Sequence, residues 1–283
     1  MRRQRSTLFY LALSYVILVV LVALIATFWI EYDAVSVRTG DRLLPPGSRT
    51  ASGQLALLGT DQLGRDLFEQ IIEGARISLI VGFATLALAG SVGVFIGMAS
   101  GYFGGAFDRI MMRLADVQLA FPSILLAILI AAVIGPSVRN VIITLSLTRW
   151  VVFARVARSV TLSTKKLEYV EATKNLGAGH LHIFRTCVLP ACLSAVLVVG
   201  TVELGLVVIA ESSLSFLGLG TPQNMPSWGV TIANGRDYLD SAWWISTLPG
   251  VALALLVISI GIIGDTIRDK ADPYMAGLPS KRR

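Results

Sequence analysis

The sequence has few of the side chains that perform chemistry in enzymes. Only 15% of its 283 residues are charged, and it contains two histidines and two cysteines. The pattern Gly-x-x-x-x-Gly-Lys-Ser/Thr, whose backbone cradles nucleotide phosphates, does not occur. His180 and His182 stand at i and i+2, so a helix points them to different sides, and no catalytic constellation accompanies them. We therefore expect a chain that is not an enzyme and that binds neither a cofactor nor a metal ion itself.

The sequence has too few cysteines for a structural zinc site, and its basic residues are too scattered for a nucleic-acid surface. Cys187 and Cys192 flank Pro190, and two thiolates alone do not complete a structural zinc site. On the cytoplasmic side, where the topology below places them, a disulfide is not expected, so both are predicted to be small buried side chains. The basic residues do not gather with aromatic side chains on one soluble face, which excludes a nucleic-acid partner.

Apolar residues dominate the chain. Hydrophobic residues make up 54% of it and the mean hydropathy is +0.72, too apolar for a soluble domain of this length. A membrane-spanning helix needs about 20 mostly apolar residues. Six stretches qualify: Leu8–Ile30, Ile77–Ser100, Val117–Ile134, Val138–Val156, Ala191–Ala210 and Trp244–Ile263. The first is longer than the ~7–15 apolar residues of a cleaved signal peptide, so we interpret it as a retained anchor.

The distribution of lysine and arginine predicts the orientation. With six spans both termini share one side, and that side would hold sixteen of the 24 basic residues; seven lie on the other side and Arg149 lies within a span. Because positive residues stay cytoplasmic, both termini and the loop of residues 158–190 are predicted to be inside the cell. The loops 31–76 and 211–243 would then be outside, and the net charge of +6 favours contact with anionic membrane lipids.

The predicted cytoplasmic loop contains a short helix, a glycine break and a second helix that leads into the fifth span. Glu168 to Leu176 is rich in helix formers, and Tyr169, Ala172 and Leu176 fall on one face. Gly177 ends the helix, and Pro190, after Leu189, suits the first turn of the next one. The small side chains of Ala172 and Thr173 would allow another protein to approach closely. An ordinary amphipathic helix on the membrane surface is the alternative interpretation.

This loop resembles the EAA loop of ABC importer permeases, in which Glu-Ala-Ala is followed at fixed spacing by Gly and by Ile-x-Leu-Pro. Glu171, Ala172, Gly177, Leu189 and Pro190 match in register, whereas Thr173 and Cys187 depart from the pattern. The resemblance implies an all-α membrane protein with the type I importer permease fold in the inner or plasma membrane. It also implies that Glu168, Tyr169, Glu171, Ala172, Thr173, Leu176, Gly177, Leu189 and Pro190 contact an ATPase.

The implied assembly contains four further components. They are a second permease of similar fold, two cytoplasmic ATPase subunits that bind ATP and magnesium, and an extracytoplasmic solute-binding protein. Within the chain, we expect an anchor helix and the start of an external loop at 1–57, an external interfacial segment at 58–76, a five-helix core at 77–272 with the coupling loop at 158–190, and a cytoplasmic tail at 273–283.

A wider resemblance covers residues 58 to 272 and points to permeases of dipeptide, oligopeptide and nickel importers. The segments that carry it begin at Leu58-Gly-Thr-Asp, Gly101-Tyr-Phe-Gly-Gly, Ser213-Leu-Ser-Phe-Leu-Gly-Leu-Gly, Pro226-Ser-Trp-Gly and Gly264-Asp. Thr60 or Asp61 is expected to cap a short helix lying along the external interface. The Gly101 segment is expected to be the first cytoplasmic loop. Ser213–Gly220 is either a re-entrant segment or a passive turn.

Two charged residues interrupt the predicted spans. Glu203 lies near the middle of the fifth span and Arg149 within the fourth. A charge in hydrocarbon costs about 2.5–3.5 kcal/mol, so such groups face protein or water. Either they line the translocation path or they pair and hold two helices together. Glu211, nearer the external surface, is expected to be solvated.

The sequence thus predicts a permease subunit that forms half of a path for peptides, with nickel or another small solute as the alternative substrate. An ion-driven secondary transporter is a rival interpretation, although no internal repeat with broken helices accompanies Glu203. A membrane scaffold that recruits cytoplasmic proteins is another, because it would share the docking loop.

Overall fold

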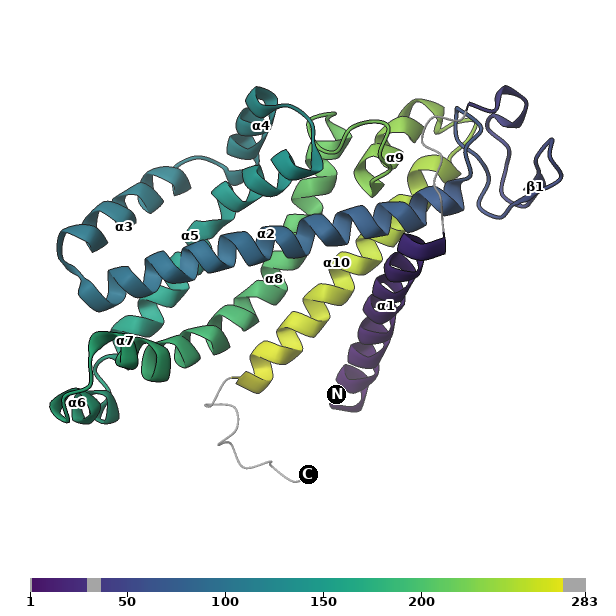
Figure 1. Ribbon diagram of the computed structural model, residues 1–283. Coiled ribbons are helices and arrows are strands. Elements are labelled where there is room, and N and C mark those ends of the chain that lie inside the picture. The colour runs from purple at the N-terminus through teal and green to yellow at the C-terminus, as the bar shows by residue number, and fades with distance from the viewer. Residues whose placement is uncertain (1, 30–36, 272–283) are drawn as a thin grey trace.

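The computed structural model describes residues 2–29 and 37–271 and is almost entirely helical (Figure 1). The α-helices are α1 (Arg2–Trp29), α2 (Leu67–Phe103), α3 (Gly105–Leu119), α4 (Ser123–Ile134), α5 (Val138–Thr164), α6 (Glu168–Asn175), α7 (His180–Ile183), α8 (Leu189–Phe216), α9 (Trp228–Gly235) and α10 (Trp244–Ala271). Shorter elements are the 3₁₀ turns η1 (Thr39–Asp41) and η3 (Arg236–Tyr238), the π-helical turn η2 (Phe184–Val188), and an antiparallel pair of strands, β1 (Ser48–Arg49) and β2 (Leu55–Ala56). The predicted tail at 273–283 lies outside the described residues.

Within the described residues, five helices are long and apolar enough to cross a membrane, and α3 with α4 makes a sixth crossing if this bent pair counts as one span. The single helix expected at Val117–Ile134 does not form, because α3 and α4 are bent by 91° at their junction. Pro122 lacks a backbone N–H and disfavours helical geometry at Phe121. At 12 residues, α4 is only about 18 Å long, short of the ~30 Å hydrocarbon thickness.

Helix α2 is the central element of the bundle. Its 37 residues begin at Leu67, and the Asp66 carboxylate caps it by accepting a hydrogen bond from the Phe68 N–H at 2.7 Å. The separate interfacial helix expected here is therefore the first part of α2, and the cap is Asp66 rather than Thr60 or Asp61. At about 1.5 Å per residue, α2 is roughly 55 Å long and extends beyond the hydrocarbon.

Helices α2 and α5 pack at close range through a row of glycines. A Cβ atom at Gly97 would lie 2.2 Å from the carbonyl oxygen of Ala154, and one at Gly93 would lie 2.4 Å from that of Trp150. Small residues let helix backbones approach closely where van der Waals packing drives association, as in membranes. Helix α2 also contributes buried residues to all four hydrophobic clusters of the described chain.

The predicted first cytoplasmic loop is largely helical. Gly104 and Gly105, with φ of +67° and +65°, form a tight turn that leads directly from α2 into α3. The two cysteines lie elsewhere, in η2 and at the start of α8, and are free and buried, Cys187 at 7% and Cys192 at 0% exposure. Their expected role as small packing side chains is confirmed.

The bundle has two distinct ends (Figure 1). The first turns of α1, the last turns of α10, and helices α6 and α7 lie toward one end, which we call the α6 end. The strand pair and α9 lie toward the other, the α9 end. The start of α1 and the end of α10 therefore share one end with the predicted docking loop, as six crossings require.

Candidate functional site

Helix α6 presents an uncovered apolar face. Leu176 is 89% and Tyr169 is 52% exposed, and Ala172 between them is exposed as well. Val170 on the opposite face is buried and attaches the helix to the bundle. Glu168 and Glu171 lie in the first turn, where the helix dipole favours negative charge. The structure thus brings Tyr169, Ala172 and Leu176 onto one open face, whereas Glu171 is exposed on the side of α6 that borders a cavity with Val170.

A glycine turn separates α6 from the next helix. Gly177 has φ of +86°, a conformation that glycine adopts without the steric cost of a Cβ atom. No atom lies within 4 Å of a Cβ built there, so backbone conformation rather than crowding calls for glycine. Thr173, the departure from the family pattern, turns its hydroxyl back to donate to the Tyr169 carbonyl at 2.7 Å.

The second half of the loop is continuous with the fifth span. Residues His180–Phe216, comprising α7, η2 and α8, form one 37-residue helical segment that we call the rod. Pro190 has no N–H to donate, and the preceding turn widens so that the Leu189 N–H bonds to the Phe184 carbonyl five residues earlier. Leu189 and Pro190 therefore join the loop to the membrane span without a break.

Aromatic contacts fasten the rod to the end of α2. The Tyr102 hydroxyl hydrogen-bonds His180 Nδ1 at 2.9 Å, and the Tyr102 and Phe184 rings lie 4.8 Å apart. Lys165, just before α6, donates to the Gly101 carbonyl at 2.7 Å. His180 is exposed, as expected for a loop residue, but it also holds Tyr102, a pairing across 78 positions that no local sequence signal indicates.

The two charges within the spans meet between α5 and α8. Arg149 Nη1 lies 3.4 Å from Glu203 Oε2, and their side chains are only 16% and 8% exposed. The contact is long for an ion pair, and Arg149 Nε is buried without a hydrogen-bond partner. The predicted pairing is thus present, in a geometry that leaves hydrogen-bonding capacity unused.

Glu211 is fully buried, so the expectation that it is solvated was wrong. Its carboxylate accepts hydrogen bonds from Ser78 of α2 at 3.0 Å and from Ser215, one turn along α8, at 2.8 Å. Ser215 also accepts from the Thr221 N–H, and the Thr221 hydroxyl donates to Ser227 at 3.0 Å. These bonds attach α2, α8 and the start of α9 to one another.

The Ser213–Gly220 segment is the last turn of α8 followed by a tight turn. Gly218, with φ of +75°, reverses the chain. Helix α9 then folds back against α8, α2 and α10, with Trp228 only 1% exposed and its indole N–H bonded to the Ile71 carbonyl at 2.9 Å. The segment 213–220 thus ends α8 and reverses the chain. The segment that folds back into the bundle is α9.

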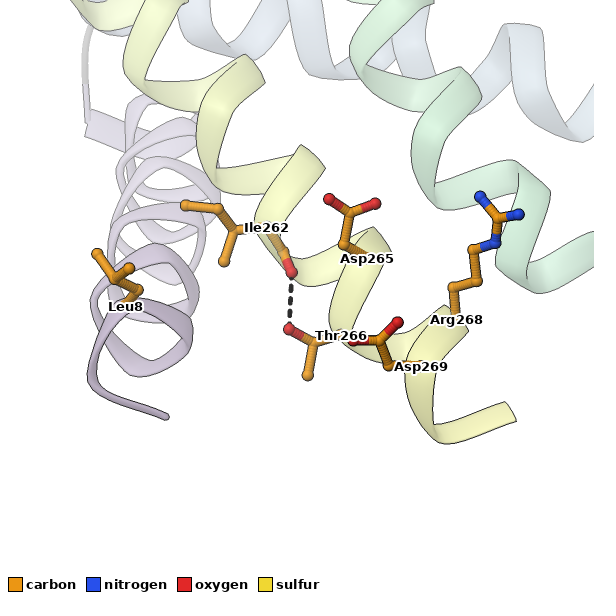
Figure 2. A pocket seen from close by; sticks show the side chains of 6 residues that line it. All are labelled: Leu8, Ile262, Asp265, Thr266, Arg268 and Asp269. Atoms are coloured by element: carbon orange, nitrogen blue, oxygen red, sulfur yellow. Dashed lines mark hydrogen bonds between the residues drawn. The ribbon is translucent and has the colours of Figure 1, made fainter. Parts of the chain in front are cut away.

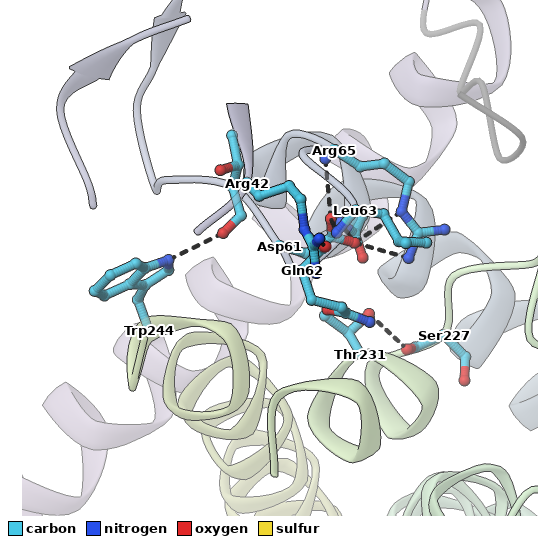
Figure 3. Close-up of polar contacts among 10 residues, drawn as sticks. Arg42, Asp61, Gln62, Leu63, Arg65, Ser227, Thr231 and Trp244 are labelled. Carbon is cyan, nitrogen blue, oxygen red and sulfur yellow. Dashed lines mark hydrogen bonds and ion pairs between the residues drawn. The ribbon is translucent and has the colours of Figure 1, made fainter. Parts of the chain in front are cut away.

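The Leu58–Asp66 motif holds the first long loop onto the bundle (Figure 3). Asp61 accepts hydrogen bonds from the N–H groups of Leu63 and Arg65 at 2.8 and 2.9 Å. It also binds Arg65 Nε at 2.7 Å and Gln70 Nε2 at 2.9 Å. Trp244 of α10 donates to the Thr60 carbonyl at 3.2 Å. The motif therefore clamps residues 37–66 to α2 and α10.

A charged cavity of about 400 Å³ lies between the start of α1 and the end of α10 (Figure 2). Leu8, Ile262, Asp265, Thr266, Arg268 and Asp269 line it. It adds carboxylates and a guanidinium to the α6 end. Within residues 2–29 and 37–271, no group of three or more His, Cys, Asp or Glu side chains is placed to hold a metal ion.

Solved structures define the class of this fold. The chain matches the methionine ABC transporter MetNI in an inward-facing conformation with a TM-score of 0.58 at 18% identity, over 72% of this chain and 96% of that one. It matches an amino acid ABC transporter with a TM-score of 0.52 at 15% identity, over 75% and 95% of the two chains. The architecture is that of a type I ABC importer permease.

Sequence comparisons then identify the family. Residues 93–277 match the family described as "Binding-protein-dependent transport system inner membrane component". The chain is 37% identical to the di/tripeptide transport system permease protein DppC of Pseudomonas aeruginosa, over 93% of this chain and 87% of that protein. It is 40% identical to a putative peptide transport system permease of Brucella suis (97% and 90%) and 35% identical to the nickel permease NikC of Escherichia coli (94% and 94%). This chain belongs to that family and is a multi-pass inner-membrane protein.

Proposed function

We propose that this chain is the permease subunit of an ATP-driven peptide importer and forms half of the translocation path. ATP and magnesium would be bound by two separate ATPase subunits, and this chain would hydrolyse nothing. The family membership and the similarity to peptide permeases such as P. aeruginosa DppC support this proposal.

The observation that carries the proposal is the open apolar face of α6 at the end of a continuous rod. Leu176 and Tyr169 have no cover within the described chain, and exposed apolar surface of this kind is typical of interaction sites. An ATPase that binds there could displace α6 and, through the turn at Gly177 and the aromatic contacts of Tyr102, tilt the rod. Tilting would alternate the path between its inward-open and outward-open states.

The two ends would then serve different partners. The α6 end would face the cytoplasm with both termini, and the α9 end would face the solute-binding protein outside. A second permease of similar fold would complete the path. Arg149 and Glu203 supply one charge of each sign, which matches the carboxylate and amine termini of a peptide, and Glu203 lies on the rod. We place this pair beside the path.

Purification of the tagged chain from gently solubilised membranes tests the proposal. An ATPase should co-purify with the native chain and be lost from the Glu171→Lys variant. Glu171 is exposed, so the reversal should leave the fold intact. Asp240→Lys, an equal charge reversal at an exposed position of the α9 end, is the matched control and should retain the ATPase.

The substrate is then assigned by uptake of labelled dipeptides and of nickel into vesicles that contain the whole complex. Peptide uptake that requires ATP supports the proposal in full. Nickel uptake alone would change the substrate and keep the importer. Ion-driven uptake by a chain that purifies without an ATPase would overturn the importer assignment.

A further inference from the structure

An apolar groove runs along the bundle between α2 and the rod. Its volume is about 510 Å³, and apart from Ser91 and Arg185 all of its lining residues are apolar. Phe95 and Leu193 on its two walls are 71% and 45% exposed. At its floor, a Cβ atom on Gly90 would meet nothing within 4 Å, so the groove is open along its base.

The groove has the length of one membrane leaflet. On α2 it extends from Leu86 to Met98, which at 1.5 Å per residue is about 18 Å. One leaflet contributes roughly 15 Å, half of the ~30 Å hydrocarbon core. The groove begins near the middle of α2 and reaches toward the α6 end, where Leu181 and Arg185 of α7 and η2 line it.

Among the described residues that line the groove, Arg185 is the only charged one. It is exposed, and within residues 2–29 and 37–271 its guanidinium makes no ion pair or hydrogen bond. A positive group at the edge of the hydrocarbon attracts anionic lipid head groups by about 1 kcal/mol per residue. The groove thus combines an apolar wall of about the length of one leaflet with an unpaired cation at its α6 end.

We propose that this groove binds one anionic phospholipid, with an acyl chain between α2 and the rod and the phosphate on Arg185. An apolar helix of another subunit seated there would leave the guanidinium without a counter-charge. A phosphate supplies that charge with the geometry that arginine favours. The inference goes beyond the proposed transport function and does not depend on it.

Native mass spectrometry of the full-length chain in micelles containing phosphatidylglycerol or phosphatidylcholine tests the site. The native chain should retain phosphatidylglycerol about fivefold better than phosphatidylcholine. This factor corresponds to about 1 kcal/mol per arginine. Arg185→Gln should abolish this preference. Arg109→Gln, the same charge change at an exposed position of α3 outside the groove, should leave it unchanged. Gly90→Leu, which fills the floor, should lower the retention of both lipids.

Two results would overturn the lipid site. One is an unchanged preference for phosphatidylglycerol in Arg185→Gln. The other is a photo-crosslinker at Leu193 that, in membranes, reacts with another subunit rather than with lipid, which would assign the groove to a protein partner. Neither measurement involves ATP or uptake, so failure of the lipid site and failure of the importer assignment are distinguishable.

Discussion

The two ends of the bundle are built on opposite principles. At the α9 end, polar groups are buried and paired: Asp61 is 1% and Glu211 0% exposed, and each accepts several hydrogen bonds. At the α6 end, apolar groups are exposed, with Leu176 at 89%. Buried, satisfied polar networks fix a single arrangement, whereas exposed apolar surface outside the membrane is typical of interaction sites. The α9 end is therefore held together by polar contacts within this chain, whereas the proposed docking face at the α6 end is left open.

The sharpest test of this comparison is Leu176→Asp. Burial of a leucine side chain contributes about 1.5–3 kcal/mol, so its loss should weaken ATPase binding by roughly 10- to 100-fold and abolish ATP-driven uptake. The thermal unfolding temperature should stay unchanged, because Leu176 contributes nothing to the core. Titration of the ATPase onto the permease in nanodiscs measures the effect. Leu239→Asp, at a half-exposed leucine of the α9 end, is the control. Equal ATPase affinity in both variants would contradict the docking surface.

At Glu211, in contrast, a substitution is expected to lower the stability of the chain. Glu211→Ala leaves the hydroxyls of Ser78 and Ser215 buried without their acceptor, which costs about 1–3 kcal/mol. The variant should unfold at lower temperature, as followed by tryptophan fluorescence in detergent. Glu171→Ala at the α6 end should leave the unfolding temperature unchanged. A Glu211→Ala variant as stable as the native chain would show that the serine contacts do not stabilise the α9 end.

Sequence reasoning was more successful where function depends on local pattern. The face of Tyr169, Ala172 and Leu176 and the turn at Gly177 follow from helix periodicity and glycine alone, and the structure contains both. Glu211 could not be placed in this way, because its burial depends on Ser78, 133 residues away. Ser212 and Ser215 lie one and four residues after Glu211 on the same helix, and their hydroxyls both donate to it. In the sequence, these nearby serines were a sign that this carboxylate could have partners inside the protein.

The errors in the spans have a similar origin. Hydropathy marks where apolar residues lie but not how a helix bends, so the break between α3 and α4 was missed although Pro122 stands at it. Hydropathy also gives no sign of where two helices touch, as Gly74 illustrates. Gly74 is the place where α2 contacts the Trp228 ring, since a Cβ atom there would lie 2.8 Å from that indole. A close contact between distant segments, rather than flexibility, requires this glycine.

A smaller effect is expected at the joint between α6 and the rod. Gly177→Ala forces a residue with a Cβ atom into φ of +86°, at a cost of about 1–2 kcal/mol. Because no neighbour crowds the site, the change should alter the angle of α6 and reduce uptake several-fold while global stability is kept. Gly179→Ala, two residues along and without positive φ, is the control. Uptake lowered equally by both changes would show that backbone angle is not the reason for Gly177.

A small effect on stability is expected midway between the ends, at Arg149 and Glu203. Polar pairs inside membrane bundles contribute about 0.6 kcal/mol on average by double-mutant cycles, and the 3.4 Å separation favours no more than that. Arg149→Gln, Glu203→Gln and the double variant should therefore unfold within a few degrees of the native chain. If the pair lies beside the path, each single variant should raise the KM for peptides far more than it lowers stability. A large coupling energy with unchanged KM would instead make the pair a purely structural link between α5 and the rod, and the path would then have to be sought on other faces of these helices.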